Sequence, residues 1–435
     1  MGKRIPPLNP LVNNPPDWLL EGAAHLWLPY TQMQTAPMSL PVERTEGVHI
    51  HLSDGRKLID ATSSWWTAAH GYNHPHIAAA VTAQLKKMPH VMLGGLSHEP
   101  ASKLAKRLAG LLPGDLDHVF FSESGSVAVE IAMKMAMQYW INQGQRGRTR
   151  FICFRGGYHG DTIATMSVCD PDEGMHSLFK GALPEQILAD LPTTEDRARS
   201  FEALVAQHAA EAAAIIVEPL VQGAGGMLMH DAEVLRKLRA AADKNNLLLI
   251  FDEIFVGLGR AGQMFACVEA NVLPDIVTLS KALTGGTMAL AATIGRAHVF
   301  EAFLSESASA ALMHGPTYMG NPLACAAANA SLDLYEQEPR LAQAASIEAH
   351  LARALAPARS LPHVRDVRVK GAIGVIELDE IRDMNRVKRR FVEEGVWLRP
   401  FGRILYTTPP LVMGQAELAH ITGTMLKIAA EAAQY

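Results

Sequence analysis

Two charged side chains directly follow apolar, strand-like runs and are candidates for chemistry. The run Leu247–Phe251 ends at Asp252, and the run Ile276–Leu279 is followed by Ser280 and Lys281. A buried carboxylate is costly unless a metal, an arginine or a protonated ring nitrogen lies opposite it. A desolvated lysine has a lowered pKa and can become a nucleophile. The alternatives are a structural ion pair for Asp252 and a solvent-facing position for Lys281.

A second group of residues could bind an anion and a planar ligand. A short strand leads into Gly125 and Ser126, and a long helix is predicted over 127–142. Free N–H groups at a helix N-terminus bind phosphate, so these two residues are candidate phosphate ligands. The alternative is a simple helix cap by Ser126. Tyr158 follows the predicted strand 150–154 among glycines, and it could lie on an aromatic ligand or pack in the core.

Four further side chains are weaker candidates. Thr317 lies in the Gly- and Pro-rich segment 314–322, where it could donate to a phosphate or belong to a simple turn. Trp65 and Tyr30 could form an apolar wall, and Arg399 could bind a carboxylate with two hydrogen bonds. Core packing for the tryptophan and a surface ion pair for Arg399 are the alternatives.

Composition excludes several classes of protein. The chain has 435 residues and a net charge of −5, which argues against a nucleic-acid-binding surface. Its four cysteines form no C-x-x-C pair, so we predict neither a metal site nor a disulfide scaffold. The N-terminal residues lack the apolar stretch of a signal peptide, and no apolar run reaches the length of a membrane span. We therefore expect a cytoplasmic enzyme.

The order of elements predicts an α/β fold. From about residue 76, helices alternate with short apolar strands, which indicates a parallel sheet covered on both faces. An irregular arm over 1–45 and a hairpin over 47–55 precede it, and 340–435 form a smaller α/β unit. Polar residues at strand ends then meet at the carboxyl edge, where such sheets bind ligands. The predicted helices of the main unit span 77–88, 102–111, 127–142 and 231–245. Its predicted strands span 119–121, 150–154, 214–218, 247–251, 276–279 and 291–295.

Taken together, these motifs resemble the signature of the class III aminotransferases. The likeness extends from about Leu26 to the C-terminus and is strongest in the segments 252–260 and 274–281; Asp252 and Lys281 are 281 − 252 = 29 residues apart. It implies fold type I of the transferases that use pyridoxal 5′-phosphate (PLP). That fold has a large domain with a mainly parallel seven-stranded sheet between helices, and a smaller α/β domain from both termini. The expected units are an N-terminal arm with part of the small domain, the large PLP-binding domain and the C-terminal small domain, over 1–70, 71–330 and 331–435.

The resemblance also implies a role for each candidate residue. Lys281 is expected to hold PLP as a Schiff base and to move the proton during transamination, while Asp252 pairs with the ring nitrogen. Tyr158, stacked on the ring, is the third residue expected to be catalytic. Thr317 is expected to come from the partner subunit, so that the active site forms at the interface of a homodimer. The residues expected to bind PLP are Gly125, Ser126, Tyr158, Asp252, Lys281, Pro316 and Thr317.

The segments 25–33, 63–66, 71–75 and 314–318 are similar in more detail to one branch of this family, the diaminononanoate synthases of biotin biosynthesis. This likeness implies that S-adenosylmethionine donates an amino group and 8-amino-7-oxononanoate accepts it, in a ping-pong reaction. Phe255 stands where many members of the wider family carry glutamine, which argues against ornithine- or GABA-type activity. The expected substrate contacts are Tyr30, Trp65, Asp161, Gly315 and Arg399.

Other functions remain open at this point. The same product could be made with lysine as the amino donor, or the chain could be another class III aminotransferase. An aminomutase of the glutamate-1-semialdehyde type would need no external donor and would lack the Trp65–Trp66 pair. A protein of this fold that only binds a ligand would be expected to have lost Lys281 or Asp252.

Overall fold

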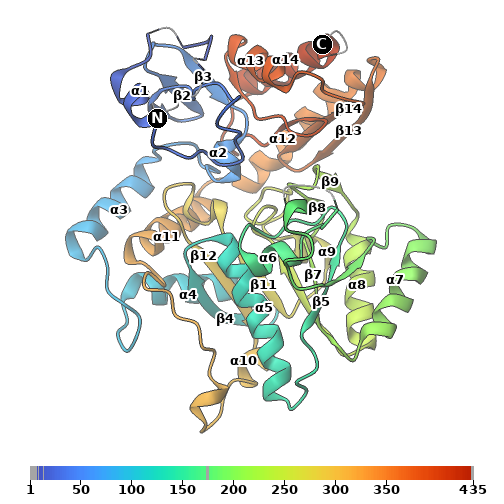
Figure 1. Cartoon of the computed structure of the whole chain (residues 1–435). Coiled ribbons are helices and arrows are strands. Elements are labelled where there is room, and N and C mark those ends of the chain that lie inside the picture. Colours follow the sequence, from blue (N-terminus) through green and yellow to red (C-terminus); the bar gives the residue numbers. More distant parts are fainter. Residues whose placement is uncertain (1–6, 8, 13, 173–175, 433–435) are drawn as a thin grey trace, which may run out of the picture.

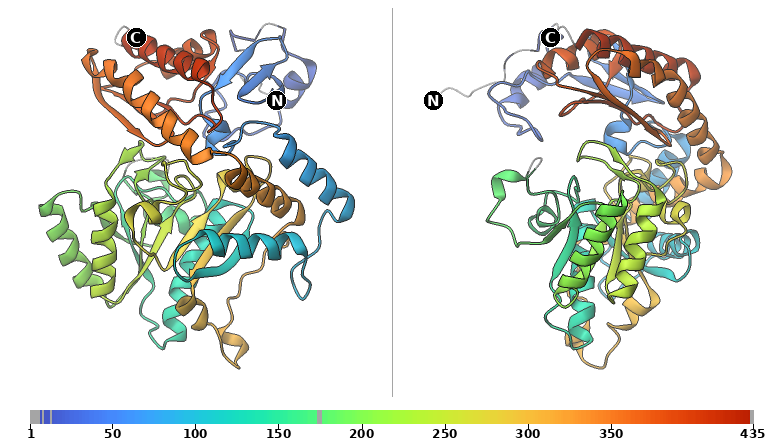
Figure 2. Two further views of the ribbon diagram at one scale, coloured as in Figure 1. Left: turned by 180° about the vertical axis from the view of Figure 1, so that it is seen from behind. Right: turned by 90° about the vertical axis from the view of Figure 1, so that its right-hand side faces the viewer.

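A computed structural model of the chain describes residues 7, 9–12, 14–172 and 176–432. Figure 1 shows a large α/β region, coloured cyan to orange, and above it a smaller region in which both ends of the chain, blue and red, lie side by side. The two views in Figure 2 show the same arrangement.

The large region is built on one sheet with the strand order β4-β12-β11-β10-β7-β5-β6. Its strands run parallel except β12, which is antiparallel to both neighbours. The predicted mainly parallel seven-stranded sheet is therefore confirmed. Its strands are β4 (Leu116–Ser122), β5 (Arg150–Phe154), β6 (Ile187–Ala189), β7 (Ala212–Val217), β10 (Leu248–Asp252), β11 (Ile276–Leu279) and β12 (Ala291–Arg296).

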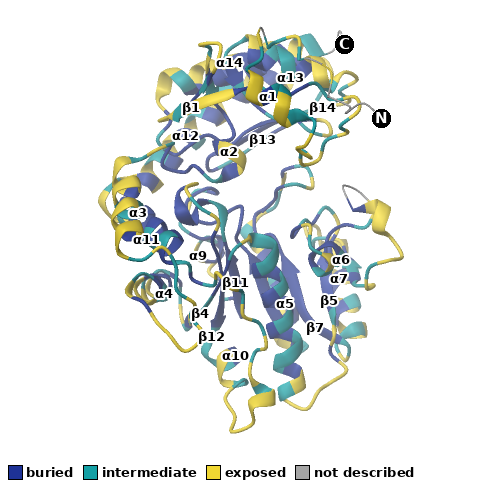
Figure 3. Cartoon of the chain, turned by 60° about the vertical axis from the view of Figure 1, so that its left-hand side comes forward, coloured by how far each residue is buried: buried dark blue, intermediate teal, exposed yellow. Residues whose placement is uncertain are grey.

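Side chains of the central strands alternate between two apolar cores. On β10, Leu248 and Ile250 pack in the core under α5 (Gly125–Asn142), whereas Leu249 and Phe251 belong to the core that includes α7 (Glu195–His208) and α8 (Ala232–Lys244). Both faces are thus covered, and Figure 3 shows these strands as buried. This is why the predicted strands read as continuous apolar runs rather than as alternating ones.

The helices differ from the prediction mainly at their ends. The predicted helix 127–142 begins at Gly125, and its cap is Ser124, whose side chain accepts from the Val127 N–H. The reading of Ser126 as the cap was wrong, because Ser126 lies inside the first turn. Sequence reasoning also missed α7 and β6. The other helices of this region are α3 (Pro75–Lys87), α4 (Glu99–Leu111), α6 (Ile163–Ser167), α7 (Glu195–His208), α8 (Ala232–Lys244), α9 (Ala266–Ala270), α10 (Ala297–Glu301) and α11 (Pro322–Gln337), with 3-10 helices η1 (Ser177–Phe179), η2 (Lys281–Thr284) and η3 (Ala308–Ala310).

The smaller region joins the two ends of the chain through strand pairing. β15 (Val396–Trp397) adds in parallel to β3 (Lys57–Asp60), at the edge of the sheet β1-β2-β3-β15. The expectation that 1–45 is irregular was wrong at α1 (Asp17–Ala23) and at the start of β1 (Val42–Glu46). The helix α1 was missed because seven residues are too few to show a helical period. The remaining elements are α1 (Asp17–Ala23), β1 (Val42–Glu46), β2 (His49–Leu52), α2 (Ser63–Trp66), α12 (Arg340–Leu355), η4 (Ala356–Ser360), β13 (Val364–Lys370), β14 (Ile373–Leu378), α13 (Met384–Glu393), β16 (Ile404–Thr407) and α14 (Gln415–Ala432), with the hairpin β8 (Val221–Gln222) and β9 (Leu228–Met229) in the large region.

The boundaries of the predicted domains stay a proposal. The boundary at 330/331 falls inside the continuous helix α11, and the sheet that contains β3 and β15 supports a small domain made from both termini. Within the described ranges, no helix is long and apolar enough to cross a membrane.

Arg260 ties the large region to both ends of the chain. Its guanidinium donates to the carbonyl oxygens of Ala372 and Pro409, at 3.2 and 2.6 Å, and to Ser63 Oγ at 3.3 Å. The residue is only 2% exposed, and burial lowers its pKa to about 10. These oxygen partners offset part of the cost of removing the cation from water, and the carboxylate of Asp60 also favours the charged form.

We predict that Arg260→Met lowers the free energy of unfolding by about 2–4 kcal/mol, because two buried carbonyls lose their donor. Urea unfolding of the purified protein measures this. The control is Arg199→Met, whose side chain is 72% exposed and pairs with Asp196; a change below about 0.5 kcal/mol is expected there. Equal losses in the two variants would contradict the role of Arg260.

Candidate active site

A cavity of about 150 Å³ opens at the carboxyl ends of β10 and β11. This is the edge of the sheet at which the sequence predicted a ligand site. Five of the seven residues predicted to bind the cofactor line it, namely Gly125, Ser126, Tyr158, Asp252 and Lys281. The other lining residues are Trp66, His159, Gly160, Glu218, Ile254, Phe255 and Ser280.

Asp252 is the last residue of β10 and is 4% exposed. Its Oδ2 lies 2.8 Å from His159 Nδ1, and its Oδ1 accepts from Thr278 Oγ1 at 3.1 Å. Thr278 is the register partner of Asp252 on β11. The carboxylate is therefore held in one orientation at the wall of the cavity, as an acceptor for a protonated ring nitrogen.

Lys281 begins η2, one residue beyond β11, and has a left-handed φ of 45°. Its Nζ lies 4.9 Å from the centre of the Trp66 ring. Burial lowers the pKa of Lys281, and the carboxylates of Asp252, Glu218 and Asp161 oppose this only in part. A lowered pKa increases the fraction of neutral amine, which is the form that attacks a carbonyl.

Gly125 and Ser126 lie in the first turn of α5, where backbone N–H groups have no acceptor within the helix. The loop of Gly160 approaches closely, and the Asp161 N–H donates to Ser126 Oγ at 3.2 Å. A Cβ on Gly160 would overlap Ser126, so this approach requires glycine. The N-terminus of an 18-residue helix beside small residues suits a phosphate.

Hydroxyl groups and a carboxylate gather at the mouth of the cavity. Tyr158 Oη donates to Asp161 Oδ1 at 2.9 Å and lies 3.2 Å from Tyr30 Oη, and Tyr30 also donates to Asp161 Oδ2. Burial raises the pKa of both tyrosines, that of Tyr30 to about 12. The ring of His176 lies within 14° of parallel to Tyr158, and its Nε2 is 3.3 Å from Asp161 Oδ1. The side chain of Asp161 is still 48% exposed, which leaves it open to a substrate amine.

The tryptophan pair lies in a left-handed turn, with φ values from 49° to 76° over residues 63–66. Such a backbone costs roughly 1–2 kcal/mol per residue. The turn directs the two rings to different places. Trp66 is 9% exposed and packs 4.3 Å from Phe255, centre to centre, inside the cavity. Trp65 is 38% exposed and packs against Tyr30.

Asp60 holds the strained turn in place. Its carboxylate accepts from the N–H groups of Thr62 and Ser64, at 2.9 and 2.7 Å, and from Tyr72 Oη at 2.6 Å. Asp60 is fully buried, and burial raises its pKa. Backbone strain at a functional site persists only where the surroundings fix it in this way.

Trp65 lies between Tyr30 and Arg399. The guanidinium carbon of Arg399 is 4.5 Å from the centre of the Trp65 ring, and the Tyr30 ring meets Trp65 edge-on at 6.0 Å. Burial lowers the pKa of Arg399. Four of the five residues predicted to contact the substrate, namely Asp161, Tyr30, Trp65 and Arg399, thus form one connected group beside the cavity.

The structure does not bring the segment of Gly315, Pro316 and Thr317 to the cavity of its own chain. Gly315 and Thr317 are exposed, and a Cβ added to Gly315 would meet no atom within 4 Å beyond its chain neighbours. His314, just before them, lies 3.1 Å from Lys134 Nζ on α5. A contact of Thr317 with the cofactor would therefore be made in another copy of the chain.

Sequence reasoning missed Glu218 and His159. Glu218 Oε2 and Oε1 accept from the N–H groups of Tyr158 and Gly223, both at 2.9 Å, and burial raises the pKa of Glu218 to about 7. Like Asp252, Glu218 is an acidic residue directly after an apolar strand. The pattern that indicated Asp252 as a candidate site residue was therefore present for Glu218 as well. His159 adjoins Tyr158 in sequence, and nothing in its local pattern shows that it reaches Asp252.

Most of the chain is similar to known aminotransferases. Residues 30–429 match the family described as aminotransferase class-III. The adenosylmethionine-8-amino-7-oxononanoate aminotransferase of Mycobacterium leprae is 47% identical over 416 residues, which cover 94% of this chain and 95% of the relative. That of Corynebacterium glutamicum is 46% identical over 407 residues, or 91% and 95% of the two chains.

Solved structures agree with these sequences. The adenosylmethionine-8-amino-7-oxononanoate aminotransferase of Methanocaldococcus jannaschii superposes with a TM-score of 0.89 at 34% identity and covers 94% of this chain and 97% of its own. A PLP-bound amine transaminase from an uncultivated Pseudomonas species superposes with a TM-score of 0.87 at 32% identity. The match covers 93% of this chain and 98% of that one. The chain thus belongs to the class III aminotransferase family, in the branch of the adenosylmethionine-8-amino-7-oxononanoate aminotransferases.

Proposed function

We propose that the chain transfers an amino group from S-adenosylmethionine to 8-amino-7-oxononanoate, giving 7,8-diaminononanoate in biotin biosynthesis. Its relatives are named for this activity. The arrangement at the cavity mouth supports it, because Asp161 and Arg399 flank the rings of Tyr30 and Trp65. An amine and a carboxylate joined by an apolar chain match that order of groups.

Class III aminotransferases use PLP, and the residues of the cavity fit it. Gly125 and Ser126 would hold its phosphate at the N-terminus of α5, where Gly160 approaches Ser126 closely. Asp252 would face its ring nitrogen, and Tyr158 would lie against its ring. When bound, PLP supplies the carbonyl that takes up the amino group and a ring that withdraws electrons from the reacting carbon.

The chain's own groups then bind, orient and move protons. Lys281 Nζ, with its lowered pKa, can take the proton from the carbon that carries the donor's amino group and return it to the acceptor. His159 and Thr278 hold the carboxylate of Asp252 in one orientation, so that its negative charge would face the ring nitrogen of the cofactor. Trp66 and Phe255 form an apolar side that excludes water.

Substrate binding falls to the groups at the mouth. Asp161 would accept from the amine of the incoming substrate, while Tyr30 and Tyr158 hold that carboxylate in place. Arg399 would bind the carboxylate of 8-amino-7-oxononanoate, with its guanidinium plane supported by Trp65.

Half-reactions test the proposed function. S-Adenosylmethionine added alone to the PLP-loaded enzyme should convert the visible absorbance of the cofactor to that of the pyridoxamine form, because the amino group stays on the enzyme until the acceptor arrives. Lysine added alone should not. Lys281→Ala should abolish the response, whereas Lys244→Ala, whose side chain is 72% exposed, should respond as the wild type does.

The other outcomes select among the alternatives. A response to lysine but not to S-adenosylmethionine would assign lysine as the donor. Product formation from an amino-keto substrate without any donor would indicate an aminomutase. Turnover by Lys281→Ala would remove that residue from its proposed role.

Arg399→Ala should weaken the binding of 8-amino-7-oxononanoate by roughly 2–5 kcal/mol, the range for losing one member of a buried charge pair. The KM of each substrate, measured with the other saturating, checks this. Arg403→Ala is the matched control, because Arg403 is 49% exposed and pairs with Glu377 away from the cavity. An unchanged KM for both substrates in Arg399→Ala would contradict the assignment.

We also propose that the enzyme is a homodimer whose active sites lie at the subunit interface. Pro316 and Thr317 would complete the cofactor site of the other subunit, since this segment is partly or fully exposed and lies apart from the cavity of its own chain. The exposed side chains of Met92, Leu96 and Met313 would be covered by the same association.

A hybrid dimer tests the contribution of Thr317 in trans. Lys281→Ala and Thr317→Val subunits, each impaired at limiting PLP, are mixed and refolded together. If Thr317 acts across the interface, each hybrid contains one site with both residues intact and recovers about half of the wild-type activity. Activity no higher than the mean of the two parents, or a protein that sediments as a monomer, would contradict the proposal.

The cytoplasmic location expected from the sequence remains a proposal as well. All four cysteines are free thiols in the structure and are buried, which is compatible with a reducing compartment.

A further inference from the structure

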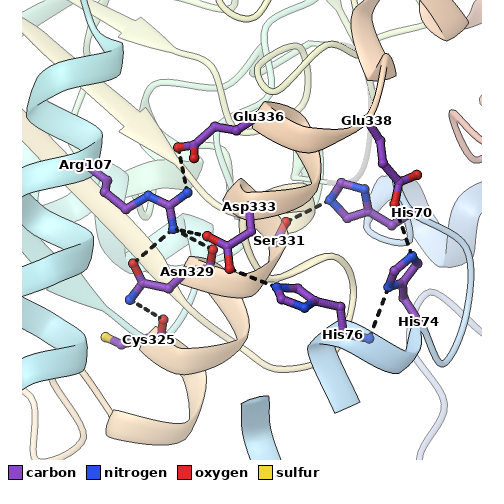
Figure 4. Close-up of polar contacts among 10 residues, drawn as sticks. All are labelled: His70, His74, His76, Arg107, Cys325, Asn329, Ser331, Asp333, Glu336 and Glu338. Carbon is purple, nitrogen blue, oxygen red and sulfur yellow. Dashed lines mark hydrogen bonds and ion pairs between the residues drawn. The ribbon is translucent and has the colours of Figure 1, made fainter. Parts of the chain in front are cut away.

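A polar network joins the start of α3 and helix α4 to α11 and the link into α12 (Figure 4). It lies outside the set of residues that line the cavity, and nothing in the proposed mechanism uses it. It contains three histidines, of which His70 is the most buried, at 3% exposure.

His70 is the centre of the inner half of this network. Its Nδ1 accepts from Arg340 Nε at 2.9 Å, and its Nε2 lies 3.0 Å from Ser331 Oγ. Arginine can only donate, so the hydrogen of a neutral His70 must be on Nε2 and must point to Ser331. The Ser331 hydroxyl is then free to donate, and it lies 3.5 Å from the carbonyl oxygen of Ala282. We call Arg340, His70, Ser331 and the Ala282 carbonyl the inner relay.

The inner relay ends on the turn that carries Lys281. Ala282 is the residue after Lys281 in η2. His70 also packs against Gly285, the residue that ends this turn with a φ of 61°; a Cβ there would lie 3.1 Å from His70 Cδ2 and 2.8 Å from Ile77 Cδ1. His70 thus restrains the turn at two points.

The turn needs such support because Lys281 itself has a left-handed backbone, with a φ of 45°. A residue with a side chain adopts this conformation at a cost of order 1–3 kcal/mol and keeps it only where its surroundings over-determine it. The relay works only while His70 is neutral, and burial together with Arg340 lowers the pKa of His70 to about 3. His70 is therefore neutral near neutral pH, and the direction of its hydrogen bonds is constant there.

We propose that His70 and Ser331 are positioning residues that fix the turn of Lys281, and so set where Lys281 Nζ lies among the groups of the cavity. This inference rests on the proposed function of Lys281. The carboxylates that act on Lys281 are those of Asp252, Glu218 and Asp161, so a displaced Nζ changes its distance from all of them.

The outer half of the network supplies a matched control. His76 Nε2 lies 2.8 Å from Asp333 Oδ2, and Arg107 donates to Asp333 and Glu336 at 2.8 and 2.7 Å. Figure 4 shows Asp333 and Glu336 on the same helix α11 as Ser331, while His76 and Arg107 reach them from α3 and α4. The side chain of His76 is 42% exposed, and its contact does not lead to η2.

The test compares Ser331→Ala with His76→Gln in the PLP-loaded, full-length enzyme. Ser331→Ala removes the hydroxyl that reaches Ala282. It should lower kcat roughly tenfold while KM changes less than about twofold. The reason is that Lys281 Nζ is displaced from the reacting atoms, whereas the groups that bind the substrate keep their positions. It should also move the pH midpoint of the cofactor's visible absorbance by roughly half a unit or more, since that midpoint reports the surroundings of Lys281 Nζ. His76→Gln should leave both quantities unchanged.

The outcomes separate the inference from the proposed function. Loss of the cofactor band in Lys281→Ala tests the role of Lys281, and Ser331→Ala should retain the band. An unchanged kcat and midpoint in Ser331→Ala, even with a lower melting temperature, would overturn the inference, as would equal shifts in His76→Gln. If Ser331→Ala fails to bind PLP, His70→Gln is measured in the same way and its kcat and midpoint decide.

Discussion

The carboxylate of Asp252 is the group on which the rest of the site depends. A carboxylate at the end of a central strand has lost most of its contact with water, and it is tolerable only with partners placed for it. His159 and Thr278 take one oxygen each, and both depend on the fold. Thr278 is opposite because β10 and β11 are parallel and in register, and the same register puts Lys281 just beyond the adjacent strand end. The acid, the lysine and the cavity between them are consequences of one strand pairing.

A second constraint comes from the two ends of the chain. The strained turn over 63–66 is fixed by Asp60, and Ser63 Oγ donates to the carbonyl oxygen of Thr408 while it accepts from Arg260. The N-terminal segment, the C-terminal segment and the sheet domain therefore meet at the turn that places Trp65 and Trp66. Strain and buried charge are concentrated at the turn whose Trp66 lines the cavity, and hydrogen bonds from three distant parts of the chain offset their cost.

The sequence predicted the groups whose positions follow from strand ends and helix starts. Asp252, Lys281, Gly125 and Ser126 line one cavity because a parallel sheet brings its carboxyl ends together, and that geometry is implicit in the alternation of elements. Short elements such as β6 and α1 escaped prediction because three or seven residues show no period. His176 and His159 escaped because their contacts lie across loops. The tryptophan pair was predicted as one feature, but a left-handed turn splits it, and positive φ at four non-glycine residues in a row has no sequence signal.

One cavity must accept two unlike molecules in turn, and the distribution of rigid and adaptable groups addresses this requirement. Asp161 is fixed by two tyrosine hydroxyls and approached by His176, so the group proposed to contact a substrate amine would keep one position in both half-reactions. Arg399 has a planar cation stacked on Trp65, and stacking permits sliding where a hydrogen-bonded ion pair would not. The aromatic faces between them are apolar enough for an alkyl chain and polarisable enough for a sulfonium. Under the proposed function, a fixed anion at one side and a cation over Trp65 at the other would let a single site accept both substrates in turn, with the parts that differ along the aromatic wall.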